Sequence, residues 1–120
     1  MKVLITDDSE FMRLIIKAAL QEVDPNLEIF EAENGDVAVE IYRENRPEMV
    51  FLDIIMPVKN GIMAMEEIRQ LNPNVKIVIV TSVGQEEMVN KANELGVNAF
   101  IPKPFQPQEI KDVFTQLRGM

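Results

Sequence analysis

Five short apolar runs alternate along the chain with segments of helical periodicity. The runs cover residues 3–6, 27–30, 49–52, 75–80 and 97–101. The first, third and fourth are almost wholly apolar, as expected of parallel strands that are buried on both faces. The second and fifth are more mixed, which is typical of edge strands. The pattern therefore predicts five strands, each followed by a helix.

The segments between the runs carry apolar residues at the spacing of one helix face. We expect five buried stripes, formed by Phe11, Leu14, Ile15 and Ala18; Val37 and Ile41; Ala64, Ile68 and Leu71; Met88, Ala92 and Leu95; and Ile110, Val113, Phe114 and Leu117. Asn34 is placed to cap the second helix, and Pro47 follows its expected end.

Five such strand–helix units over residues 1–120 predict a single domain with an α/β fold. The expected architecture is flavodoxin-like, a doubly wound (βα)5 fold with a parallel five-stranded sheet of strand order 2-1-3-4-5. Ligands of such sheets bind at the carboxyl ends of the strands, near the switch point between strands 1 and 3. The functional residues are therefore expected at the carboxyl edge of the sheet.

The composition excludes several kinds of function. The 120 residues include no cysteine and no histidine, so disulfides, thiolate or imidazole metal sites and Ser-His-Asp catalysis are ruled out. Acidic residues outnumber basic ones 20 to 12, giving a net charge of −8. This charge disfavours binding to nucleic acid or to anionic membranes. With no signal peptide or membrane span in sight, we expect a cytoplasmic protein.

Polar residues follow four of the five predicted strands. Asp7 and Asp8 follow the first strand, Asp53 the third, Thr81 the fourth and Lys103 the fifth. Three carboxylates at one sheet edge repel one another unless a cation joins them, and oxygen ligands favour Mg²⁺. A hydroxyl and an ammonium group suit the oxygens of a phosphoryl group. The set predicts transfer of a phosphoryl group onto an aspartate.

Each of these residues also has an ordinary structural explanation. An Asp pair after a strand is usually a solvated turn or a helix cap, and a terminal Thr or Lys is a weaker signal still. The occurrence of all of them at four separate strand ends favours a functional site.

Four segments resemble a known family. They are Val-Leu-Ile-Thr-Asp-Asp-Ser at 3–9, Leu-Asp-Ile-Ile-Met-Pro at 52–57 with Gly61, Val-Thr-Ser at 80–82 and Lys-Pro-Phe at 103–105. Over essentially its whole length the chain is similar to the receiver domain of two-component response regulators, and most similar to the single-domain, CheY-like chemotaxis type. The order and spacing of the four segments make the resemblance specific.

The resemblance implies roles at the acidic end of the sheet. Asp53 would be the phosphoacceptor. Asp7 and Asp8 would serve a Mg²⁺ site, with Asp8 and Asp53 as direct ligands. The backbone carbonyl of Ile55 would be a further ligand. The loop after Asp53 is expected to be shaped by Pro57, which fixes φ, and by Gly61, which can adopt a positive φ.

The resemblance also implies a switch. Thr81 and Lys103 would bind the phosphoryl oxygens, with a cis peptide before Pro104. Thr81 would move on phosphorylation, and Phe100 on the fifth strand would follow it inward. Ile55 and Val83 occupy the positions that tune dephosphorylation in the family.

The expected partners follow from the same resemblance. We expect no effector domain after Met120, and therefore regulation through separate partners. A histidine kinase of the chemotaxis type would be the donor. The target would be a motor-switch protein or adaptor, bound by the fourth helix, fifth strand and fifth helix through outward residues such as Glu87 and Lys91. We expect a monomeric signalling protein that takes part in its own phosphorylation and dephosphorylation, rather than an enzyme.

Four alternatives remain open. The chain could be a phosphorelay intermediate, or a receiver-like domain that binds partners without phosphorylation. A Mg²⁺-dependent phosphohydrolase with an aspartyl nucleophile would usually have Asp-x-Asp after the first strand. A flavodoxin-like electron carrier would need a Ser/Thr/Gly-rich phosphate loop there. The adjacent Asp7 and Asp8 disfavour both of these.

Overall fold

A computed structural model describes residues 1–82 and 86–119, and in it five parallel strands form one sheet of order β2-β1-β3-β4-β5. This confirms the predicted flavodoxin-like fold and strand order. The strands are β1 (Lys2–Thr6), β2 (Glu28–Ala32), β3 (Met49–Leu52), β4 (Lys76–Ser82) and β5 (Ala99–Lys103). The helices are α1 (Glu10–Val23), α2 (Gly35–Asn45), α3 (Gly61–Leu71), α4 (Glu86–Glu94) and α5 (Pro107–Arg118).

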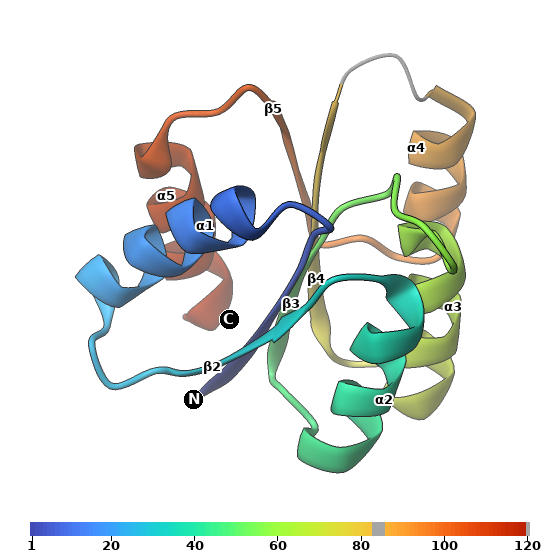
Figure 1. Ribbon diagram of the computed structural model, residues 1–120, viewed down its shortest axis with the longest axis horizontal. Helices are drawn as coiled ribbons and strands as arrows, with labels where there is room; N and C mark the ends of the chain where they lie inside the picture. Colours follow the sequence, from blue (N-terminus) through green and yellow to red (C-terminus); the bar gives the residue numbers. More distant parts are fainter. Residues whose placement is uncertain (83–85, 120) are drawn as a thin grey trace.

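Two helical layers cover the sheet. Helices α1 and α5 lie on one face, and α2, α3 and α4 lie on the other (Figure 1). Successive strand side chains point to opposite faces, so each strand supplies both cores. In β1, for example, Val3 and Ile5 belong to the core beneath α1 and α5, whereas Leu4 belongs to the other core. This two-sided burial explains why the central strands are almost wholly apolar.

The strands extend further toward the predicted site than the apolar runs do. β4 continues to Ser82 and β5 to Lys103, and parallel pairing joins Thr81 to Pro102 and Ser82 to Lys103. Thr81 and Lys103 therefore lie on the strands themselves, where the sheet restricts their backbone positions. The prediction that the second and fifth strands are edges is confirmed.

The predicted buried stripe of α1 is wrong. Phe11 and Leu14 are 70% and 59% exposed, and Ala18 is exposed as well. The helix instead buries Ile16, Ala19 and Leu20, with Met12 and Val23 partly buried beside them. α1 carries two overlapping apolar stripes, and the one that reaches further along the helix packs against the sheet. The other stripe is left on the surface.

The remaining helices largely follow their predicted faces. The stripes of α3, α4 and α5 pack against the two cores. In α2, Val37 and Ile41 are only partly buried, because Ala38, Val39 and Tyr42 take the central positions. Asn34 caps α2 as predicted, accepting a hydrogen bond of 2.9 Å from the Val37 amide. Across residues 1–82 and 86–119, no helix has the length and apolar character needed to span a membrane.

Candidate functional site

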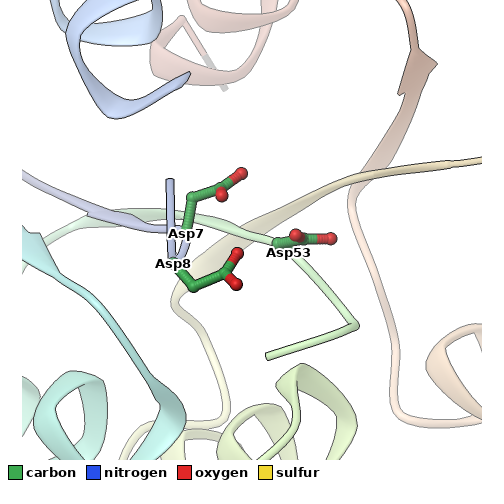
Figure 2. A group of neighbouring side chains, drawn as sticks. All are labelled: Asp7, Asp8 and Asp53. Atoms are coloured by element: carbon green, nitrogen blue, oxygen red, sulfur yellow. The ribbon is translucent and has the colours of Figure 1, made fainter. Parts of the chain in front are cut away.

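The sheet brings three carboxylates together at the carboxyl ends of β1 and β3. Asp7 and Asp8 follow β1, and Asp53 follows β3, which pairs directly with β1. Each residue offers an oxygen atom that lies within 4.8 Å of those of the other two. Figure 2 shows Asp7 and Asp8 extending their side chains toward the side on which Asp53 lies. Asp7 and Asp53 are buried, whereas Asp8 is exposed.

Backbone hydrogen bonds continue the sheet up to the acidic residues. The amide of Asp7 donates to the carbonyl of Ala32 at 3.1 Å, and the amide of Asp53 donates to the carbonyl of Thr6 at 3.0 Å. The Ser9 amide donates to Asp7 Oδ1 at 2.9 Å. Asp7 and Asp53 are therefore held by the strand ends, and their positions depend on the register of the sheet.

Lys103 bridges two of the carboxylates. Its Nζ atom lies 2.8 Å from Asp7 Oδ2 and 3.2 Å from Asp53 Oδ2. The Lys103 side chain is only 17% exposed, so the ion pairs are poorly screened by solvent. The lysine reaches the site from the end of β5, where the peptide to Pro104 is cis, as the resemblance implied. Within the described residues, Lys103 is thus the one side chain that forms ion pairs with the carboxylates of the acidic cluster.

Burial and charge shift the pKa values of this pair. Burial is the main cause that raises the pKa of Asp53 above its usual range, and the charge of Asp7 adds to it, while Lys103 opposes both. Burial alone would lower the pKa of Lys103, but its bond to Asp7 and the charges of Asp53 and Asp7 outweigh this and raise it. Lys103 therefore stays charged, and ionising Asp53 is costly without a further cation.

The acidic cluster fits a hard divalent cation. Its donors are all carboxylate oxygens, which Mg²⁺ prefers, and exposed Asp8 leaves a solvent side for the waters that Mg²⁺ retains. The carbonyl of Ile54 is occupied, since it accepts a hydrogen bond of 2.7 Å from the Gly61 amide. The proposed ligation by the next carbonyl, that of Ile55, stays a prediction.

Two glycines shape the loop after Asp53. A Cβ atom on Gly61 would lie 2.0 Å from the Asp53 carbonyl oxygen, and one on Gly35 would lie 2.3 Å from the Lys59 carbonyl oxygen. Gly61 is therefore needed for close approach, and the expectation that it uses a positive φ is wrong. The positive φ in this loop, +70°, occurs at Val58 instead.

Thr81 lies at the end of β4 with its hydroxyl buried. That oxygen has no hydrogen bond of normal geometry within residues 1–82 and 86–119, although it is close enough to favour the ionised form of Asp53 slightly. Phe100 pairs with Ile79 on the neighbouring strand and packs, partly buried, against the core beneath α4. Thr81 lies two residues after Ile79, so it shares that face of the sheet. Val83 lies outside the described residues.

Two residues beside the site were not expected from the sequence. Arg13 donates to the Asp7 carbonyl at 2.7 Å. Lys59 forms ion pairs with Asp36 and Glu67, and its carbonyl accepts a hydrogen bond from the Gly35 amide, which fixes the loop after Asp53 against α2. For Arg13 the available signal was a basic residue between two apolar ones, but surface residues have the same pattern, and Lys59 offered no such signal.

Comparisons with known proteins agree with this geometry. Residues 3–115 match the response regulator receiver domain. The chain is 43% identical to the chemotaxis protein CheY of Halobacterium salinarum, covering 97% of this chain and 95% of that protein. It is 40% identical to CheY of Thermotoga maritima, covering 97% and 96%. The structure of the receiver domain of AraT, a response regulator of Geobacillus stearothermophilus, matches with a TM-score of 0.89 at 30% identity, covering 98% and 92%.

The chain therefore belongs to the response regulator receiver family. Members of this family are signalling proteins that work through phosphorylation, and they bind Mg²⁺ at an acidic cluster such as the one formed by Asp7, Asp8 and Asp53.

Proposed function

We propose that this protein is a signalling switch that accepts a phosphoryl group on Asp53 from a histidine kinase, in a Mg²⁺-dependent reaction, and then binds a chemotaxis target. The observation that carries the proposal is the cluster of three carboxylates bridged by Lys103 at the carboxyl ends of the strands. The relatives named above support the chemotaxis assignment. The proposal implies a cytoplasmic monomer that is not an enzyme in its own right.

The proposed reaction is a displacement at phosphorus. A carboxylate oxygen of Asp53 forms a bond to the phosphorus of the donor's phosphohistidine, the P–N bond breaks, and its electron pair stays on the imidazole nitrogen, which takes up a proton. Bound Mg²⁺, held by Asp8, Asp53 and the Ile55 carbonyl, would neutralise charge on the transferring group. Asp7 supports the site from its buried position.

Lys103 and Thr81 would receive the phosphoryl oxygens. Lys103 already contacts Asp53 Oδ2, so its ammonium group lies beside the position of the new phosphoryl group. The buried hydroxyl of Thr81 has no normal hydrogen-bond partner in the described structure, so it is free to donate to a phosphoryl oxygen. Phosphorylation replaces one negative charge with about two and adds strong acceptor oxygens.

The switch would connect this site to β5. If Thr81 turns toward the phosphoryl group, it leaves space on the face of the sheet that it shares with Phe100. Phe100 is only partly buried there and can move further inward. Such movement would change the surface of α4, β5 and α5, where we place the target. Differential contacts of this kind are what allow phosphorylation to shift a two-state equilibrium.

The surroundings of the site favour a protein as the phosphoryl donor. Phe11 and Leu14 are exposed on α1, shortly after Asp8, and Ile55 and Val58 are 51% and 78% exposed in the loop after Asp53. Exposed apolar side chains in the two segments that follow Asp8 and Asp53 suit a protein surface that covers them during transfer. A small phosphorylated donor would contact few of them. A protein donor is common to the chemotaxis and phosphorelay alternatives, whereas a phosphohydrolase would turn over small phosphomonoesters.

Replacement of Asp53 by asparagine tests the acceptor. Asp53→Asn keeps the shape of the side chain and removes the nucleophilic oxygen, so the protein should fold and lose phosphorylation. The measurement is intact mass after incubation with acetyl phosphate and Mg²⁺, followed by mapping of the modified residue. Asp112→Asn on α5 is the control and should be labelled like the parent. Undiminished labelling of Asp53→Asn would assign the acceptor to another residue.

Removal of the Thr81 hydroxyl tests the switch. Thr81→Ala leaves Asp53 and the acidic cluster intact, so phosphorylation should persist. Amide NMR spectra of the phosphorylated variant should lack most of the shift changes that the phosphorylated parent shows at Lys91, Phe100 and Lys111. Equal changes in the two proteins would mean that Thr81 does not couple the site to α4, β5 and α5.

Polar substitution on α1 tests the docking surface for the donor. Phe11→Ser and Leu14→Ser should each slow phosphotransfer from the cognate kinase by about tenfold, the typical loss of one buried apolar anchor in an interface. Phosphorylation by acetyl phosphate is the internal control and should not change, because neither side chain is part of the acidic cluster. Unchanged transfer from the kinase would exclude this face of α1 from the interface.

A further inference from the structure

Asp8 differs from the other two acidic residues in how it is held. Asp7 and Asp53 are buried and paired with Lys103, whereas Asp8 is exposed. Across residues 1–82 and 86–119, the Asp8 carboxylate takes part in no hydrogen bond or ion pair. Its oxygen nevertheless lies within 4.8 Å of those of Asp7 and Asp53. The backbone of Asp8 therefore supplies the main restraint on its side chain, because it sets the direction of the Cα–Cβ bond.

The backbone before Asp8 is fixed by Arg13. The Arg13 Nη1 atom donates a hydrogen bond of 2.7 Å to the carbonyl oxygen of Asp7. Because a peptide group is planar, fixing this carbonyl also fixes the direction of the Asp8 amide and the position of the Asp8 Cα atom. The other polar atoms of Asp7 are held by Ala32, Ser9 and Lys103. Arg13 thus completes the restraint on the Asp7–Asp8 peptide.

Arg13 is itself held from the neighbouring strand. Its Nε atom donates to Glu31 Oε1 on β2 at 3.0 Å, and its side chain is only 14% exposed. Two donors of one rigid guanidinium group therefore join β2 to the loop that carries Asp8. A lysine at this position has a single ammonium group on a flexible stem and would hold such a pair of acceptors less well.

We propose that Arg13 is a positioning residue for the cation site. By holding the Asp7–Asp8 peptide, Arg13 orients the exposed Asp8 carboxylate toward the site. The inference rests on the proposed function, because it concerns the same Mg²⁺ site. Residues that orient metal ligands without touching the metal commonly contribute about 10-fold to 100-fold in affinity. Loss of Arg13 should therefore weaken Mg²⁺ binding even though all three carboxylates remain.

A purely electrostatic role predicts the opposite sign. Arg13 is a positive charge close to the place where a divalent cation would bind, and like charges repel. If Arg13 acted only through its charge, removing it would tighten Mg²⁺ binding. Lys17 offers a matched control, since it also lies on α1 and approaches Glu31, at 3.7 Å. Within the described part of the chain, Lys17 forms no hydrogen bond or ion pair with Asp7.

The experiment is a Mg²⁺ titration at constant ionic strength, followed by the amide NMR signals of Asp8 and Asp53 without any phosphoryl donor. Arg13→Met should raise the dissociation constant of Mg²⁺ about tenfold. Arg13→Lys should show a smaller rise although it retains the charge, and Lys17→Met should show none. The same spectra report whether each variant is folded. If Arg13→Met does not fold, Arg13→Lys provides the test.

The possible failures are distinguishable. Unchanged or tighter binding by a folded Arg13→Met, or binding by Arg13→Lys equal to that of the parent, would overturn the positioning role and leave the metal site intact. The positioning role would also be overturned if Lys17→Met raised the dissociation constant of Mg²⁺ as much as Arg13→Met. If the parent itself shows no Mg²⁺-dependent shifts, the metal site and the proposed function fail together with this inference.

Discussion

The contact of Lys103 with Asp7 and Asp53 is the interaction on which the rest of the site depends. Three carboxylates lie within 4.8 Å of one another, and two of them are buried. Repulsion in such a cluster is severe in a poorly solvated environment, and the ammonium group of Lys103 offsets only part of it. Burial is the main cause of the raised pKa of Asp53, and the charge of Asp7 adds to it against the opposing effect of Lys103. A divalent cation would relieve the remaining repulsion, and the proposed phosphoryl transfer requires such a cation.

The fold makes this unfavourable cluster possible. Parallel strands end at the same edge of the sheet, and pairing of β1 with β3 sets Asp7 and Asp53 side by side. β1 and β3 are almost wholly buried between two helical layers, so their ends cannot separate without exposing apolar side chains. The close approach of Gly61 to the Asp53 carbonyl and of Gly35 to the Lys59 carbonyl restrains the adjoining loop in the same way. Packing in the rest of the fold thus keeps the mutually repelling carboxylates close together.

The features that follow from hydrophobic periodicity and from the order of strands and helices could be predicted from the sequence. The features that depend on which of several possible contacts forms in the folded protein could not. Apolar runs gave the strands, their order and the convergence of Asp7, Asp8, Asp53 and Lys103, since burial on two faces leaves a strong pattern. In α1 two apolar stripes overlap, and only packing decides that Ile16 is buried and Leu14 is exposed. The contact of Arg13 with the Asp7 carbonyl and the positive φ of Val58 also arise in the folded chain alone. Such backbone contacts leave no residue pattern that distinguishes them from ordinary surface positions.

The most direct test of the account is the effect of Mg²⁺ on the free energy of unfolding near pH 7. Asp53 has a raised pKa, so its ionisation costs stability at neutral pH, and this cost disappears as the pH falls and the folded protein takes up the proton first. Mg²⁺ at about 100 times its dissociation constant should raise the free energy of unfolding by about 2.7 kcal/mol. Asp8→Ala should remove this gain and be at least as stable as the parent without metal. If Mg²⁺ leaves the unfolding of the parent unchanged at matched ionic strength, the acidic cluster is not the cation site.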